Sequence, residues 1–399
     1  MSGSTRYVTA LMLSVVSLGA LDKVIGTMHA ATLGHDNFIS SALNGVAYVL
    51  AFPVCLMIQV RRGRVTSQQA RFICRQGCWR HLLIASLGDS LRHLSFVVQP
   101  FISGLAYALT GQTEVLFVVF WSVVVFRSSF VFEELLGLAI VFGGALFLLV
   151  GQSDDRSSNI FYVLIALATT CPGGLSYVLK EKVFKDYRAV VSQSAAFLDH
   201  SSSRGSCGGR HGTTGKDELD IFAVNSTTAV LGLLWVIPIL LIGAKASQPP
   251  HNNEDSWQFT LGAMQCFAGC ASEDHSCKWA WQTYLAYIFT NIAKQISIYA
   301  LVQQANAVLT FTCFTAVPGV AALLFMLHWP LIGSAAVKWQ DWVSLATITM
   351  GVLVFKHGSM LRQAAEPDGP ARGWCWPLRK AEARTVTDCC CESLDQECS

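Results

Sequence analysis

Long apolar stretches separated by short polar connections make up most of this chain. A helix needs about 20 predominantly apolar residues to cross a bilayer, and ten segments have that length and character. The third is less regular than most because Asp89 and Arg92 lie inside it. The pattern predicts an all-α polytopic membrane protein with ten transmembrane helices, at 7–27, 38–60, 82–101, 105–126, 132–150, 160–179, 221–242, 281–302, 307–328 and 342–361.

Lysines and arginines are distributed unevenly over the connections between these spans. Basic residues favour the cytosolic side of a membrane. With ten spans, the termini and the even-numbered loops share one side, which holds 21 of the 28 Lys and Arg residues, whereas the other side holds 4. We therefore expect both termini in the cytosol.

The ten spans divide into two units of five, at 7–151 and 152–362. A unit with an odd number of helices that is repeated in one chain must insert its second copy upside down, as in many secondary transporters. We therefore expect two inverted five-helix repeats around a central cavity, followed by a cytosolic tail at 363–399.

Three connections have distinct characters. Residues 195–215 are rich in Ser and Gly, which predicts a disordered cytosolic linker. The non-cytosolic loop at 243–280 has apolar residues at helical spacing from Trp257 to Ala268, which favours a helix in the membrane interface, or else an irregular loop anchored by that Trp. The tail carries three consecutive cysteines, 389–391, that are either S-palmitoylated or unmodified.

The composition agrees with a membrane protein. Only 14% of the residues are charged, against about 25% in soluble domains. The net charge of +2 gives no reason to expect nucleic acid as a partner. The first apolar run begins within ten residues of Met1 and is too long for a cleaved leader, so a retained anchor is expected. The fourteen cysteines lack the paired spacing of a zinc site, so we predict no metal and no cofactor.

Ionisable residues inside the spans are the main functional signal. Such residues are costly at bilayer depth and usually face a protein interior or a water-filled path. Asp22 and Lys23 interrupt the first span, although a self-neutralising pair near a helix end, with Lys23 reaching the headgroups, is the alternative. The candidate substrate-cavity residues are Asp22, Lys23, Asp89, Arg92, Glu114, Asn291, Lys294 and Gln295.

Two further patterns leave alternatives open. Asp89, Arg92 and His93 share one helix face, where they form either an internal structural ion pair or a substrate-binding surface. Pro and Gly residues at 172–174 and 318–319 mark either helix breaks beside a cavity or ordinary packing kinks.

The motifs exclude several classes of protein. There is no G-x-x-x-x-G-K-[ST] motif, so direct ATP hydrolysis is not expected. No protease motif flanks Asp22 or Asp89, so we predict no enzyme, and a structural scaffold would have no use for intramembrane charges. Intramembrane acids such as Asp89 and Glu114 instead fit ion-coupled secondary transport of small organic solutes.

Several short motifs, in this order and spacing, resemble the chloroquine-resistance-transporter-like family of the drug/metabolite transporter superfamily. They are the Asp22-Lys23 step, the segment around Asp89, Thr110-Gly111, the stretch KVFKDY at 182–187 and the sequence CKWAW at 277–281. The resemblance runs from about residue 7 to 355 and leaves out the linker and the tail.

The resemblance implies a cavity that opens to one side of the membrane at a time. It implies proton-driven export of amino acids, short peptides and cationic drugs from an acidic vacuole-like or lysosome-like organelle, and we expect a monomer. Similar plant proteins carry glutathione and its precursors across the plastid envelope, which is the alternative. A nucleotide-sugar or sugar-phosphate exchanger of the same superfamily is a further alternative. By position, Asp22, Lys23, Asp89 and Lys294 would line the cavity.

The chain also departs from the family pattern. Lys294 stands where an acid is expected, and Glu114 where an amide is expected. The candidate set then holds three acids and three bases, and a neutral cavity of mixed sign suits zwitterions better than dications. In that case Lys294→Asp should shift selectivity towards cations.

The loop before the eighth predicted span departs from the family pattern as well. The family has four loop cysteines in two disulfides, but only Cys266, Cys270 and Cys277 occur here. By position the resemblance implies a Cys266–Cys277 disulfide and a free Cys270. The alternative is three reduced thiols.

Overall fold

The computed structural model describes residues 3–75, 78–102, 107–108, 110–127, 130–152, 160–202, 218–248, 256–270, 277–304, 310, 313–314, 316–333 and 339–365. Within these ranges the chain is helical, and the only strand-like pairing is an isolated bridge between Trp329 and Gly333. The α-helices are α1 (Gly3–Leu33), α2 (Ile39–Arg61), α3 (Ser67–Arg75), α4 (Cys78–Arg92), α5 (Ser95–Val98), α7 (Glu114–Phe126), α8 (Phe132–Gln152), α9 (Ile160–Ser202), α10 (Ile221–Ser247), α11 (Ser256–Phe267), α12 (Ala280–Gln304), α14 (Val317–Phe325) and α15 (Trp339–Ala365).

Four described stretches are long and apolar enough to cross a membrane. They are Arg6–Arg61, which contains α1 and α2, Phe161–Gln193, Ile221–Ser247 and Cys277–Gln304. Large apolar side chains also point outward, and Phe289, Ile237 and Leu50 are 78%, 67% and 66% exposed. Exposed apolar area on this scale suits contact with lipid. The all-α part of the prediction is confirmed for the described residues.

Each of the ten predicted spans overlaps at least one helix, but the third is not continuous. It is divided into α4, α5 and a 3-10 turn, η2 (Gln99–Phe101), with a turn at His93 and Leu94. Backbone groups freed at such a turn must be satisfied inside the protein, so the break lies where other helices surround it.

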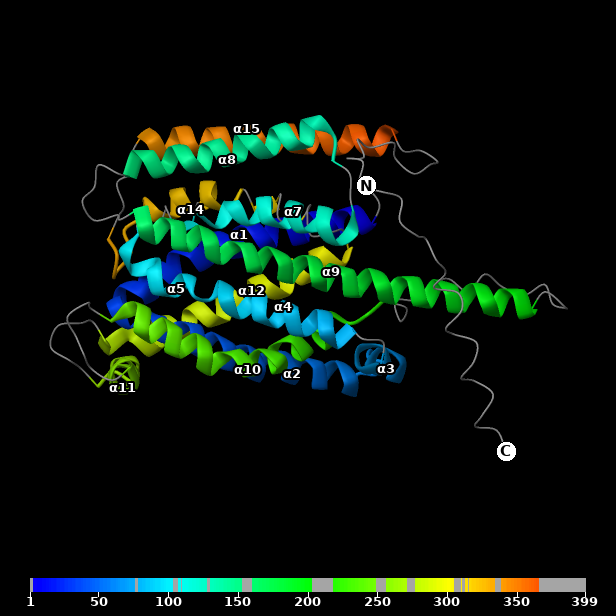
Figure 1. The fold of residues 1–399 in the computed structure, drawn as a ribbon, viewed down its shortest axis with the longest axis horizontal. Coiled ribbons are helices and arrows are strands. Elements are labelled where there is room, and N and C mark those ends of the chain that lie inside the picture. Colours follow the sequence, from blue (N-terminus) through cyan, green and yellow to red (C-terminus); the bar gives the residue numbers. More distant parts are fainter. Residues whose placement is uncertain are drawn as a thin grey trace.

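The helices pack as a bundle whose neighbours are far apart in the sequence (Figure 1). α1 packs on α12 and α14, and α9 packs on α4 and α7. α2 packs on α10, and α8 packs on α15 along one edge of the bundle. The α8–α15 contact is close because glycines face it: a Cβ on Gly137 would lie 2.4 Å from the backbone nitrogen of Phe355.

Two predictions about α9 need correction. The linker was expected to begin at residue 195, but α9 continues to Ser202 and extends beyond the bundle (Figure 1); residues 203–217 lie outside the described part. Pro172 does not break α9, which runs through it. In contrast, Pro318 lies in the first turn of α14, where a missing backbone N–H costs nothing.

The helix predicted in the long loop is confirmed as α11. Its exposed side includes Trp257, Leu261 and Met264, and its buried side includes Ala263 and Cys266. The tail with the cysteines at 389–391 lies outside the described residues.

Candidate functional site

The first element of the candidate site is a buried ion pair between α1 and α12. Lys294 Nζ lies 2.5 Å from Asp22 Oδ2, and the amide of Asn291 donates to Asp22 Oδ1 at 2.8 Å. Both carboxylate oxygens of Asp22 therefore have a partner, and Asp22 and Lys294 are 5% and 4% exposed. The alternative in which Lys23 neutralises Asp22 near a helix end is wrong, because both partners of Asp22 come from α12.

A second ion pair, with a buried lysine and a partly exposed aspartate, joins α4 and α9. Lys180 Nζ lies 2.6 Å from Asp89 Oδ2 and donates to the hydroxyl of Tyr299 at 2.9 Å. The helices approach closely at Gly88, where a Cβ would lie 2.4 Å from the carbonyl oxygen of Pro172. Lys180 is 1% exposed. The predicted sixth span ends at residue 179 and so leaves Lys180 outside the bundle, but the structure buries this residue among the helices.

Arg92 forms the third pair, with Glu114 of α7. Arg92 Nη2 lies 3.2 Å from Glu114 Oε2, and Nη1 donates to the hydroxyl of Tyr177 at 2.9 Å. Gly173 leaves the necessary space, because a Cβ there would lie 2.8 Å from both Arg92 Cδ and Glu114 Oε1. Asp89 and Arg92 thus pair with other helices, and the hypothesis of an internal pair within one helix is wrong.

Lys23 differs from these three cations. Its Nζ lies 4.5 Å from the centroid of the Tyr107 ring, in the geometry of a cation–π contact. Within the described part of the chain, Lys23 forms no ion pair with an acid.

Two adjoining cavities of about 50 Å³ each lie along these pairs. Asp89 and Lys180 line the first, and Asp22, Lys23 and Lys294 line the second. Both are lined by Tyr48, Arg92, His93 and Gln295. Of the eight candidate residues, seven line a cavity, and Glu114 contacts one only through Arg92.

The site holds one more positive charge than the sequence predicted. Asp22, Asp89 and Glu114 face four cations, because Lys180 joins Lys23, Arg92 and Lys294. The formally neutral cavity is therefore corrected to a net charge of +1. Sequence reasoning also missed the tyrosines that bond to the charges; Tyr177, three residues before Lys180 on the same helix face, was the available signal.

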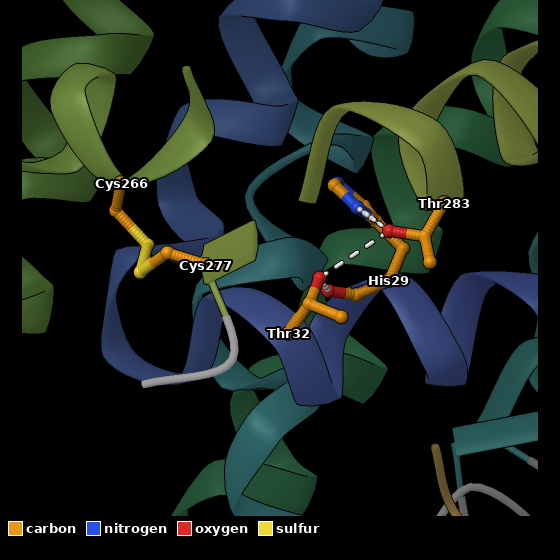
Figure 2. The surroundings of a disulfide bond; sticks show 5 residues. All are labelled: His29, Thr32, Cys266, Cys277 and Thr283. Carbon is orange, nitrogen blue, oxygen red and sulfur yellow. Dashed lines mark hydrogen bonds between the residues drawn. A yellow bond between two sulfur atoms is a disulfide. The ribbon is translucent and has the colours of Figure 1, made fainter. Parts of the chain in front are cut away.

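A disulfide lies at the end of the bundle that carries α11, which we call the disulfide end; the opposite end carries α3. Cys266 of α11 and Cys277 of η4 (Cys277–Trp279) have their sulfurs 2.07 Å apart, as the resemblance implied (Figure 2). Cys270 is exposed and free. The alternative of three reduced thiols is therefore not what the structure contains.

No family model matches the chain. Curated relatives do match. The chain is 20% identical over 356 residues to "Protein CLT1, chloroplastic" of Arabidopsis thaliana, covering 88% of this chain and 73% of the relative. It is 20% identical over 363 residues to the "Chloroquine resistance transporter" of Plasmodium vivax (strain Salvador I), covering 88% and 79%, and 24% identical over 275 residues to "Crt homolog 3" of Dictyostelium discoideum, covering 65% and 54%.

These curated homologues are chloroquine resistance transporter-like proteins, at about 20% identity over most of the chain. Those with a functional name are transporters and not enzymes. Among solved structures, one described as "Crystal structure of protein" covers 90% of this chain and 99% of its own, with a TM-score of 0.46 and 13% identity.

Proposed function

We propose that this protein is a secondary active transporter of small organic solutes that works as a monomer by proton-coupled alternating access. The names of its relatives support transport. The observation that carries the proposal is the arrangement of two ion pairs on either side of shared cavity residues. Burying charged side chains inside a membrane costs free energy, and such residues usually line a solute or ion pathway. A structural scaffold would have no use for them.

The helix neighbours support ten spans in two inverted halves. We take α1, α2, α4 with α5, α7 and α8 as the first half, and α9, α10, α12, α14 and α15 as the second. In chain order the counterparts are α1 and α9, α2 and α10, α4 with α5 and α12, α7 and α14, and α8 and α15. Under this exchange the α1–α12 and α1–α14 contacts become the α9–α4 and α9–α7 contacts, which are also present. The contacts α2–α10 and α8–α15 map onto themselves. α1 also begins and α15 ends at the same end of the bundle, which supports termini on one side, the cytosol (Figure 1).

The same exchange relates the two ion pairs. Asp22–Lys294 joins α1 to α12, and Lys180–Asp89 joins the counterparts α9 and α4 with acid and base exchanged. Each pair connects the two halves. Along α12, Lys294 of the first pair lies nearer the disulfide end than Tyr299, which bonds to Lys180 of the second pair. We assign them as the two gates of the cavity, one of which opens while the other stays closed.

The charge of the cavity favours a solute with a carboxylate. Lys23 is the cation without an acidic partner among the described residues, and a substrate carboxylate would supply one. Zwitterionic or singly anionic amino acids and short peptides therefore suit the cavity better than cationic drugs. The sugar-phosphate and nucleotide-sugar alternative is disfavoured because a single surplus charge is a weak match for a phosphate group.

Two locations remain for this activity. The first is an acidic organelle, where the solutes are amino acids and short peptides and the proton gradient drives export. The second is the plastid envelope, where the solutes are glutathione-like thiol peptides. Two observations favour this second candidate: the net charge of +1 complements a monoanion, and three relatives carry "chloroplastic" in their names.

The test is a panel of four solutes in proteoliposomes with an imposed pH gradient. Uptake of glutathione and alanyl-alanine should exceed uptake of lysine and chloroquine. A protonophore should abolish accumulation. The proposal is contradicted if no solute enters faster than into protein-free liposomes, or if lysine and chloroquine are the preferred substrates.

A further inference from the structure

A buried histidine that forms no ion pair with any described residue lies between the cavity and the disulfide. His29 belongs to α1 and is 1% exposed. Its Nε2 lies 2.8 Å from Ser40 Oγ of α2, and its Nδ1 lies 3.3 Å from Thr283 Oγ1 of α12 (Figure 2 shows the second contact). We call the set His29, Thr32, Asn37, Ser40, Gln99 and Thr283 the histidine network.

The hydrogen bonds around Ser40 determine whether Nε2 of His29 carries a proton. The backbone carbonyl of Phe96 can only accept, so the Asn37 amide nitrogen, 2.8 Å away, donates to it. The other amide atom, Asn37 Oδ1, then accepts the hydroxyl proton of Ser40 at 3.0 Å. Ser40 has no second proton, and therefore it offers a lone pair to His29. Nε2 must carry a proton.

The hydroxyl of Thr283 is compatible with both protonation states of Nδ1. Its Oγ1 lies 3.0 Å from the carbonyl oxygens of both Trp279 and Ala280, which can only accept. The Thr283 hydroxyl can donate to one of these carbonyls and offer Nδ1 a lone pair, or it can donate to Nδ1 itself. Thr32 Oγ1 donates to the carbonyl of His29 at 2.7 Å and so supplies no competing proton. Nε2 therefore faces an acceptor, and Nδ1 faces a hydroxyl that can either donate or accept, so the same contacts fit a neutral ring and an imidazolium that donates twice.

The titratable groups that face the ring come from one helix. Tyr284 and Tyr287 of α12 lie with their ring centroids 5.4 and 6.0 Å away. α2 contributes Ser40, which does not ionise. Among the described residues no carboxylate or cation forms an ion pair with His29.

The network is continuous with the cavity and with the first gate. Asn37 also donates to Gln99 Oε1 at 3.4 Å, and Gln99 lines the cavity that contains Lys23. Tyr287 stacks on the His29 ring and accepts from Asn291, the residue that holds Asp22. A change at His29 can therefore reach Asp22 through three contacts, by way of Tyr287 and Asn291.

We propose that His29 is the proton-binding residue that couples proton movement to solute movement, an assignment that rests on the proposed transport function. When the disulfide end opens to the acidic side, the ring takes a second proton, and the hydroxyls of Ser40 and Thr283 accept its two N–H groups. The extra positive charge favours entry of an anionic solute. Opening to the neutral side removes the proton, and the solute leaves with it.

The first test separates coupling from transport in proteoliposomes with radiolabelled glutathione. His29→Gln should keep counterflow at equal pH within about twofold of the wild type, but reduce accumulation driven by a pH gradient by about tenfold or more. His35→Gln, a substitution at the same end in η1 (Gly34–Phe38), should change neither. Full gradient-driven accumulation by His29→Gln would overturn the proposal, whereas absence of counterflow by the wild type would contradict the proposed function.

The second test needs no substrate. Deuterium exchange at the ring C2–H of His29, followed by mass spectrometry of the full chain in nanodiscs, reports its protonation. The midpoint of this titration measures how readily the ring takes its second proton. Thr283→Val removes the acceptor of Nδ1 and should lower that midpoint. A ring that stays neutral down to about pH 4, or a midpoint unmoved by Thr283→Val, would overturn the assignment.

Discussion

The cavity and the disulfide end bury polar groups in opposite ways. The charged centre, made of Asp22, Lys23, Asp89, Arg92, Glu114, Lys180 and Lys294, holds three ion pairs and one surplus cation. The histidine network satisfies its groups with hydroxyls, amides and backbone carbonyls alone.

This difference has a physical consequence. A buried ion pair is strong only while both partners remain, and its members hold each other in the charged state. A neutral network has no such constraint, and a single proton changes its charge. The charged centre therefore suits the joining and parting of the two halves, and the histidine network suits the sensing of protons.

The largest expected effect comes from breaking one ion pair of the charged centre. Lys294→Met leaves Asp22 buried without its cation and should lower the free energy of unfolding by about 3–5 kcal/mol. Exchanging the charges, with Asp22→Lys and Lys294→Asp together, should recover much of that loss. Thermal unfolding in detergent measures both.

The control is an exposed pair on α9. Asp186 lies 3.4 Å from Lys182, and both are partly exposed. Asp186→Asn should change stability by less than about 0.5 kcal/mol. If the exchanged double variant is as unstable as Lys294→Met, the pair does not act as a unit.

The structure also changes what Lys294→Asp can test. Because Lys294 pairs with Asp22, the single reversal places two carboxylates together. Its effect on selectivity would be mixed with a loss of stability. Lys23 is the better position for that question.

A smaller effect is expected at the disulfide end. Cys277→Ser opens the bond that closes a segment of sequence separation 11, and should cost about 2–3 kcal/mol. Thermal unfolding of the wild type in reductant should fall to the level of this variant, and the variant itself should not respond to reductant. Cys270→Ser, which changes an exposed free thiol, is the matched control. A wild type that is insensitive to reductant would show that the bond contributes nothing to this region.

The smallest effect in free energy is on selectivity. Lys23→Gln removes the surplus cation without breaking an ion pair, and should reduce the ratio of glutathione to alanyl-alanine uptake by about tenfold, or about 1.4 kcal/mol. Lys23→Arg keeps the charge and should keep the ratio. Initial rates in proteoliposomes measure it. An unchanged ratio in Lys23→Gln would refute the role of the surplus charge.

Much of the fold was predictable because a bilayer imposes a simple rule on the sequence. Each predicted span overlaps a helix, since a segment in lipid must satisfy its own backbone groups. The break after Arg92 was not predictable, because the neighbouring helices that surround it are distant in sequence. α11 was predictable from the spacing of Trp257, Leu261 and Met264, which lie on its exposed side.

The candidate site was predictable in its members more than in its contacts. Asp22, Asp89, Arg92 and Lys294 stand out because charges are rare in apolar spans. Lys180 does not stand out in the sequence, because it follows the last apolar residue of its predicted span. Only the packing of α9 on α4 shows that it is buried. His29 did not stand out either, because one neutral histidine scarcely alters an apolar pattern.

By itself, the sequence determined that this is an all-α membrane protein with charges inside its spans, since hydropathy is a local property of the chain. Only the tertiary structure decided which charges pair, that Lys23 lacks an acidic partner among the described residues, and that both ring nitrogens of His29 face hydroxyl groups. Those facts depend on residues as far apart as 22 and 294, and the distance between them is set by helix packing.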